Sequence, residues 1–202
     1  MGISERKGRE KMEMKALILS AATKMFLEDG YAKTSIRNIA DAIEYSPGTI
    51  YLYFKDKDEL LYEVQRDAFL KLLAYFNAKV RSKTAVKKLR QLCLAYVEFG
   101  LANPELYDLM FIIRAPTQVD CEVHKDNGIY AYGFLKDILK ECIDQKAIRM
   151  TDLEQATLQV WSMGHGLISL NLRNRLKEVG TPGDLPMALI SATDNFIDLI
   201  VT

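Results

Sequence analysis

The 202-residue chain has few of the residues on which metal sites, disulfide scaffolds and most active sites depend. It contains three cysteines and two histidines, and Cys93, Cys121 and Cys142 form no C-x-x-C pair. Three widely spaced cysteines are typical of a reduced, cytoplasmic protein with buried thiols. Cys121 and His124 have metal-ligand spacing, but no second pair completes a zinc site. We therefore expect no metal and no cofactor.

Long apolar runs and a net charge are also missing. No stretch approaches the roughly 18 apolar residues of a membrane span, and the N-terminus lacks an apolar signal core, so we expect a cytoplasmic protein that contacts no membrane. Formal net charge is zero, and charge alone therefore indicates no partner. The first 15 residues carry five Lys/Arg against three Asp/Glu. This segment is either a basic arm for a polyanion or a solvated terminus.

Catalytic groups are equally scarce. The two histidines, His124 and His165, have no Ser-His-Asp arrangement around them, and the chain contains no Gly-rich phosphate loop. A small helical enzyme is therefore the weakest hypothesis, and we expect no catalytic residue.

Helical periodicity and cap residues dominate what is present, and they predict nine helices and no strand, which is an all-α fold. Besides a short helix that starts at Ser46, the predicted helices cover roughly residues 9–28, 34–43, 56–81, 84–102, 103–115, 128–145, 151–178 and 184–200. Residues 117–127 have the composition of a polar loop. The predicted N-caps include Thr34, Ser46, Asp56 with Glu59, and Thr151 with Glu154.

Two short helices near the N-terminus form a helix-turn-helix candidate. In the second of them, Ile50 and Phe54 are four residues apart and can pack inward together. Thr49, Leu52 and Tyr53 then point outward. Small residues at the leading end allow that end to approach DNA closely, and its free N–H groups favour phosphate.

The stretch GYAKTSIRNIADAIEYSPGTIYLYFKDKDEL, from Gly30 to Leu60, resembles the DNA-binding signature of the tetracycline-repressor (TetR) family. The resemblance implies a nine-helix TetR-like fold. Its N-terminal three-helix unit, residues 1–56, would bind DNA, and residues 57–202 would bind an effector and dimerise. The turn departs from the usual A-G-V at Ile43, Glu44 and Tyr45, and Glu44 stands where glycine suits a left-handed backbone.

The resemblance also implies roles for individual residues. Phosphate contacts would come from Thr34, Tyr51, Tyr53 and Lys57, and contacts near base edges from Arg37, Pro47, Gly48, Thr49 and Leu52. We add the neighbouring hydroxyls of Ser35 and Ser46 to this predicted interface. Arg37 is the best candidate for a guanine contact, because its guanidinium can span O6 and N7. The alternatives are a solvated charge for Arg37, core packing for Tyr51 and a first-turn surface charge for Lys57.

Family resemblance implies a homodimer formed through the last two helices. Ser162, Gly166 and Ser169 lie at i, i+4 and i+7, and Gly164 and Gly166 both accept the cost of glycine inside a helix, which suggests that another helix approaches closely. The last helix offers an apolar face of Leu189, Phe196, Leu199 and Ile200. Buried contacts within one chain are the alternative for both faces.

The block WSMGHG, Trp161 to Gly166, resembles the Trp-His-Gly signature of one C-terminal subfamily, and NPELYDLMF resembles a common helix-six segment. These similarities imply an effector pocket lined by Tyr96, Tyr107, Met110, Phe111, Trp161 and His165. Its composition suggests an apolar or aromatic ligand. The alternative is a plain core, with His165 as a core histidine.

The predicted function is a ligand-responsive repressor that binds double-stranded DNA. A DNA-bound architectural or adaptor protein without an effector is the rival hypothesis. The sequence does not name the operator, the effector or the regulated genes.

Overall fold

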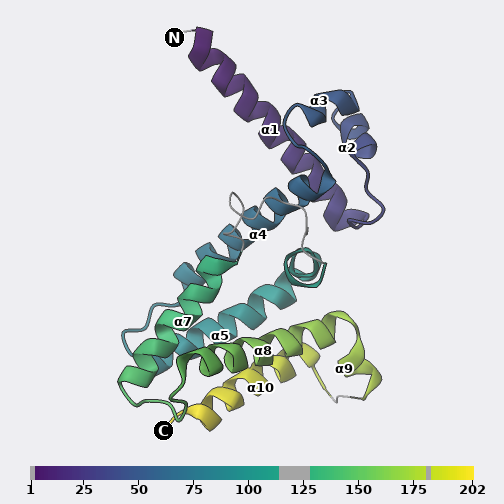
Figure 1. Ribbon diagram of the computed structural model, residues 1–202. Coiled ribbons are helices and arrows are strands. Elements are labelled where there is room, and N and C mark those ends of the chain that lie inside the picture. Colours follow the sequence, from purple (N-terminus) through teal and green to yellow (C-terminus); the bar gives the residue numbers. More distant parts are fainter. Residues whose placement is uncertain (1–2, 114–127, 181–182) are drawn as a thin grey trace. The chain divides into compact units, whose positions relative to one another are not determined.

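The computed structural model describes residues 3–113, 128–180 and 183–202 (Figure 1). These residues form ten α-helices, one π-helical segment and a single isolated bridge between Ile148 and Val201. The helices are α1 (Ile3–Glu28), α2 (Ile36–Ala42), α3 (Pro47–Tyr51), α4 (Lys57–Lys79), α5 (Ala85–Ala102), α6 (Pro104–Tyr107), α7 (Ile129–Asp144), α8 (Leu153–Leu172), α9 (Arg175–Glu178) and α10 (Leu185–Ile200), with the π-segment η1 (Asp108–Ile112) after α6. The prediction of an all-α fold is confirmed.

Two differences from the predicted helices have a local cause. The helix predicted over residues 151–178 is divided into α8 and α9, because Asn174 adopts a left-handed backbone with φ of 56°. The helix predicted over residues 103–115 begins as α6 and continues as the π-segment η1. The predicted loop at 117–127, with Cys121 and His124, lies outside the described residues.

The caps are partly as predicted. Ser46 accepts a hydrogen bond from the Thr49 backbone N–H at 3.3 Å, and Asp56 accepts one from the Glu59 backbone N–H at 2.8 Å. The cap of α2 was predicted wrongly, since Ser35 rather than Thr34 is its N-cap.

Asp152, not Thr151, caps α8 in the same way, with the Gln155 backbone N–H 3.0 Å from its carboxylate. In both cases two neighbouring residues can cap a helix, and tertiary packing selects one of them.

The first compact unit contains described residues 3–68 and 109–113. Three helices and the start of α4 enclose its core. The buried side of α1 is formed by Ile18, Ala22 and Phe26, one helical turn apart, and Leu17 is exposed. The remaining buried members of the core are Ile36, Ile39, Ala40, Ile50, Phe54, Leu60, Leu61, Val64 and Leu109.

The second compact unit contains described residues 69–108, 128–180 and 183–202. Here α5 packs against α7, α8 and α10. Charged side chains reinforce these contacts: Lys88 of α5 lies 2.7 Å from Glu141 of α7, and Arg90 pairs with Asp194 and Asp198 of α10. α5 is therefore the central helix of this bundle.

These compact units divide the chain differently from the predicted domains, 1–56 and 57–202, which remain a prediction about function. No helix in the described ranges combines the length and the apolar character needed to cross a membrane. The same ranges contain no group of three or more His, Cys, Asp or Glu side chains arranged to hold a metal ion.

Candidate functional site

The turn between α2 and α3 has the backbone expected from its sequence. Glu44 has φ of 60°, a left-handed conformation that costs a non-glycine residue roughly 1–2 kcal/mol. The next residue, Tyr45, returns its backbone N–H to the carbonyl of Ala40 at 3.0 Å. The expectation of a left-handed Glu44 is confirmed, and α2 and α3 form a helix-turn-helix.

The inner and outer faces of the segment that follows this turn are clearly separated. Ile50 and Phe54 are buried in the core of the first unit, as the four-residue spacing predicts. Leu52 is 77% exposed and Tyr51 is 55% exposed, which excludes core packing as the role of Tyr51. Gly48 is also exposed. The tip of this segment therefore presents apolar and phenolic groups to an external surface.

Two hydroxyls lie at the start of α3, and one guanidinium is exposed on α2. Ser46 and Thr49 lie 3.1 Å apart through their side-chain oxygens at the start of α3, where Pro47 is half-buried. Arg37 is exposed on α2 and forms no hydrogen bond or ion pair with any residue in the described ranges. A side chain without an internal partner is available to an external acceptor.

Thr34 and Lys57, both predicted phosphate contacts, have internal partners instead. The Thr34 side chain is buried, and its hydroxyl lies 3.0 Å from the Gly30 carbonyl. The Lys57 ammonium donates to the carbonyls of Tyr31 and Thr34, each at 3.0 Å, and lies 4.0 Å from the centroid of the Tyr31 ring. These contacts fix the turn between α1 and α2. Phosphate binding by the two residues remains a prediction, and their observed role is to position the turn.

Ser35 and Tyr53 also have local roles. Ser35 is exposed and forms a capping box with Asn38, whose side-chain oxygen accepts the Ser35 backbone N–H at 3.0 Å. Tyr53 is half-buried and packs against the core of the first unit. Tyr53 directly follows the exposed tip in sequence, and DNA binding by Ser35 and Tyr53 remains a prediction.

A second candidate site is a chain of hydrogen bonds in the second unit. Trp161 Nε1 donates to the Tyr96 hydroxyl at 3.2 Å. The hydroxyls of Tyr96 and Tyr107 lie 2.7 Å apart, and the Tyr107 hydroxyl lies 2.7 Å from His165 Nδ1. The structure thus joins four of the six predicted pocket residues. The other two, Met110 and Phe111, lie on η1 in the first unit.

Burial sets the protonation of this polar chain. It raises the pKa of Tyr96 to about 12 and raises that of Tyr107 as well, with the neighbouring Tyr96 as a further cause. Burial lowers the pKa of His165 below its ordinary value. A neutral imidazole can accept a hydrogen bond from the Tyr107 hydroxyl at Nδ1, and the ring proton is then on Nε2. Both phenols then remain neutral donors.

The depressed pKa of His165 predicts a loss of stability in mild acid. In the unfolded chain the pKa of this histidine is near 6.5. As the pH falls from about 6.5 to the lower pKa of the folded state, the unfolded chain binds the proton more readily than the folded chain, and stability is lost. As the pH decreases, the free energy of unfolding of the wild-type protein should fall more steeply than that of His165→Gln, by up to ~1.4 kcal/mol per pH unit. Urea unfolding at pH 7.5, 6.5 and 5.5 measures this. Parallel curves for the two proteins would contradict it, since His124 is common to both.

Comparison with known proteins identifies both parts of the chain. Residues 18–64 match the family model described as bacterial regulatory proteins, tetR family. Residues 89–193, more than half of the chain, match the model described as tetracyclin repressor-like, C-terminal domain. The second description does not name the Trp-His-Gly subfamily, which remains a prediction.

Individual relatives are similar over different lengths. HTH-type transcriptional regulator HbdR of Aromatoleum sp. (strain CIB) is 50% identical over 50 residues, which are 25% of this chain and 22% of HbdR. HTH-type transcriptional regulator AcrR of Shigella flexneri is 26% identical over 149 residues, 69% of each protein. A crystal structure of a regulatory protein in the tetR family from Rhodococcus RHA1 has a TM-score of 0.69 and 22% identity, covering 92% of this chain and 96% of the other. The match with HbdR thus spans less than a quarter of that protein's length.

Proposed function

The chain belongs to the TetR family of DNA-binding transcriptional regulators, and from this premise we propose that it is a cytoplasmic repressor without catalytic activity. It binds an inverted-repeat operator as a homodimer, and a small apolar or aromatic effector releases it. The observation that carries the proposal is the exposed tip of the helix-turn-helix, where Leu52 and Tyr51 face outward while Ile50 is buried. A major groove is wide enough to receive such a helix.

The DNA contacts follow from the positions of polar groups around this tip. Gly48 at the leading end permits close approach, and the exposed hydroxyl of Tyr51 is available to phosphate oxygens. Arg37 projects from α2 with no competing partner among the described residues. We assign base reading to Arg37 and backbone positioning to the phenol and hydroxyl groups.

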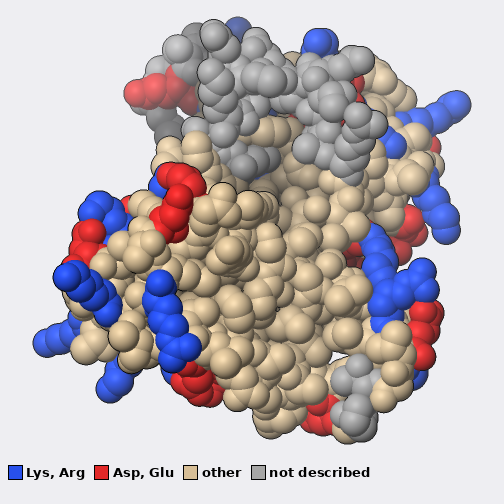
Figure 2. All heavy atoms as spheres, turned by 60° about the horizontal axis from the view of Figure 1, so that its bottom comes forward, with Lys and Arg blue, Asp and Glu red and all other residues tan. Residues whose placement is uncertain are grey.

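The proposed dimer face is formed by α8 and α10. Between Gln155 and Leu172, α8 has no Asp, Glu, Lys or Arg, and the two acidic residues of α10, Asp194 and Asp198, both pair with Arg90. Figure 2 shows this side of the second unit, where charged side chains gather at the edges and the middle is uncharged. The exposed apolar side chains on the two helices are Leu158, Trp161, Leu170, Met187 and Leu199. An uncharged face of this kind supports association with a second copy.

The proposed effector site is the polar chain of the second unit. Its four side chains offer aromatic surface, and their hydroxyl and imidazole groups would orient one polar group of an otherwise apolar ligand. α4 is the proposed lever to the DNA-binding unit, because Leu60 and Val64 belong to the core of the first unit and Leu72 and Phe76 are buried in the second. Ligand and operator would then oppose each other by a coupling of typically ~1–3 kcal/mol.

Selection of binding sites tests the proposal. The purified protein is incubated with randomised duplexes and genomic fragments at near-physiological salt, and the retained DNA is sequenced. Enrichment of an inverted repeat supports a sequence-specific dimer. Retention without sequence preference favours the architectural rival, and no retention contradicts the proposal. Candidate effectors are then titrated against the selected operator; a bound ligand that leaves operator affinity unchanged contradicts the release mechanism.

Arg37→Ala is expected to weaken binding to the selected operator by roughly 30-fold or more, because the homodimer loses two base contacts of about 1–3 kcal/mol each. Affinity for unrelated duplexes should change little, because a base contact carries sequence information. Fluorescence anisotropy with operator and scrambled duplexes measures both. Arg149→Ala, which removes an exposed arginine from the second unit, is the matched control. An equal loss on both duplexes would assign Arg37 to the phosphate backbone instead.

A further inference from the structure

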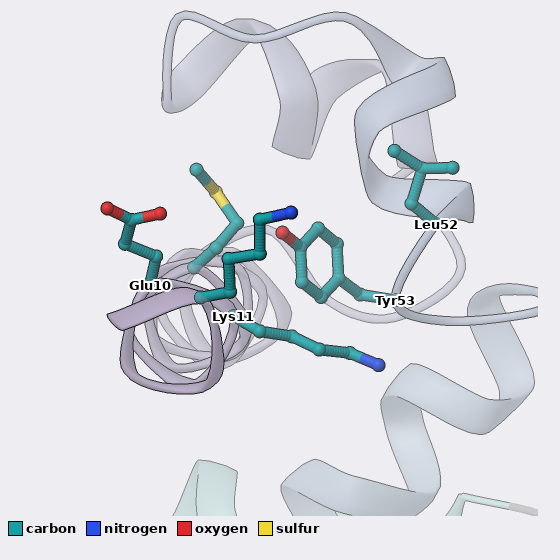
Figure 3. A pocket seen from close by; sticks show the side chains of 6 residues that line it. Glu10, Lys11, Leu52 and Tyr53 are labelled. Carbon is teal, nitrogen blue, oxygen red and sulfur yellow. The ribbon is translucent and has the colours of Figure 1, made fainter. Parts of the chain in front are cut away.

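An open groove on the first unit lies between the start of α1 and the residues that follow α3. Its volume is about 390 Å³. α1 contributes four side chains and the segment after α3 contributes two, and together they are Lys7, Glu10, Lys11, Met14, Leu52 and Tyr53. In Figure 3, Lys11 and Tyr53 border the same space, while Glu10 is turned toward the other side of α1.

Two lysines at this groove have no ion-pair partner among the described residues. Arg6 pairs with Glu10 at 2.8 Å and Arg9 approaches Glu13 at 3.6 Å, so the nearby carboxylates have partners. Lys7 and Lys11 form no ion pair with any residue between 3 and 113, 128 and 180, or 183 and 202. The two lysines are four residues apart, which places like charges on one face of α1 and disfavours the helix by a few tenths of a kcal/mol.

An anion in the groove would remove that repulsion. The surface on the far side of the groove suggests which anion it is, because Leu52 belongs to the exposed tip proposed to enter DNA, and the Tyr53 hydroxyl can donate to a phosphate oxygen. The groove is thus continuous with the proposed DNA interface and has the opposite charge to a phosphodiester strand. Neither lysine lies in the helix-turn-helix itself.

We propose that this groove binds the phosphate backbone of the operator, with Lys7 and Lys11 as sequence-independent contacts supplied by α1. The proposal rests on the DNA-binding function above and extends the footprint beyond α2 and α3. Because phosphate contacts carry no sequence information, the lysines add affinity to specific and non-specific DNA alike.

The test compares the wild-type protein with the double variant Lys7→Ala/Lys11→Ala. Dissociation constants are measured on the selected operator and on a scrambled duplex between 50 and 300 mM potassium chloride. Each lost phosphate contact lowers the slope of log K against log salt by about 0.9, and the homodimer loses four such contacts, so we expect a decrease of nearly 4. Near 0.1 M salt the affinity should fall roughly a thousandfold or more on both duplexes, and the ratio of specific to non-specific affinity should stay unchanged.

Two control variants separate a local contact from charge and folding. Lys24→Ala removes an exposed lysine from a distant turn of α1 and should leave the salt slope within experimental error of the wild type. Lys7→Arg/Lys11→Arg keeps both charges and should restore the slope. Thermal unfolding of each variant confirms that the first unit is intact.

The outcomes are distinct for the groove and for the function. A wild-type slope in the double variant, on a protein that binds its operator, overturns the groove proposal and leaves the repressor function standing. A slope change of the same size in Lys24→Ala also overturns it, because net charge would then be the cause. Failure of the wild-type protein to retain any duplex overturns the proposed function itself.

Discussion

A monomer with greatly weakened operator binding is the expected result of Leu199→Glu. Leu199 is 68% exposed in the single chain, while Leu189, Ile197 and Ile200 of the same helix are buried. Burying a leucine stabilises an interface by about 1.5–3 kcal/mol, and a two-fold dimer loses this contribution twice. Two new carboxylates would also lose water in the interface. We expect dimerisation to weaken by about 3 kcal/mol or more, which is roughly a hundredfold or more.

Sedimentation equilibrium over a range of protein concentrations measures this loss, and operator titration measures its consequence. The matched control is Leu70→Glu, which introduces the same charge at a leucine of α4 that is 55% exposed and should leave the dimer intact. At protein concentrations low enough to give monomers, both variants should unfold near the unfolding temperature of the wild-type monomer, because both leucines face solvent in the single chain. A Leu199→Glu protein that remains dimeric at micromolar concentration would place the interface on other helices.

The two glycines of α8 show how far sequence reasoning about this face could go. Both were predicted to allow the close approach of another helix. A Cβ atom at Gly164 would lie 3.2 Å from Cδ1 of Tyr96, so the close neighbour there belongs to the same chain. A Cβ atom at Gly166 would meet no atom within 4 Å. Sequence spacing finds the small residues, but only the fold shows that Gly166, unlike Gly164, has open space beside it.

The helix-turn-helix was predictable because its signals are local. Proline after Ser46, the four-residue spacing of Ile50 and Phe54, and a non-glycine residue in a left-handed turn each depend on a few neighbouring residues. The roles of Thr34 and Lys57 were not predictable in this way. Their partners, Gly30 and Tyr31, lie in the turn after α1 and act through backbone carbonyls that no side-chain pattern reveals.

The helix that carries Met110 and Phe111 differs from the predicted one for a similar reason, and their place in the effector pocket stays a prediction. Regular helical spacing places them on a face with Tyr107, but η1 is π-helical, and its i→i+5 hydrogen bonds change the register of the side chains.

The sequence gives only a weak signal for the two lysines of the groove. Lys7, Lys11 and Met14 follow an i, i+4, i+7 pattern, yet an exposed helix end with mixed charges is ordinary until its neighbour across the groove is known.

Tyr107 is expected to be among the residues that stabilise the second unit most. It is 0% exposed, its ring centroid lies 5.9 Å from that of Tyr96 and 5.8 Å from that of His165, and a Cβ atom at Gly100 would lie 3.1 Å from Tyr107 Cδ2. The ring thus fills the space beside α5, and its hydroxyl joins α5 to α8. Tyr107→Ala should lower the free energy of unfolding by about 3–5 kcal/mol, the usual cost of deleting a buried aromatic ring.

Tyr107→Phe separates the ring from the hydroxyl. It keeps the packing but removes the hydrogen-bond partner of Tyr96 and of His165 Nδ1, and we expect a loss of about 1–3 kcal/mol. Urea unfolding at pH 7.5 and one fixed protein concentration measures both variants, because dimerisation makes stability depend on concentration. Tyr130→Ala, at a tyrosine that is 61% exposed on α7, should stay within about 0.5 kcal/mol of the wild type. If Tyr107→Phe matches the wild type, the hydrogen-bond chain contributes little to folding, which would contradict the expected loss.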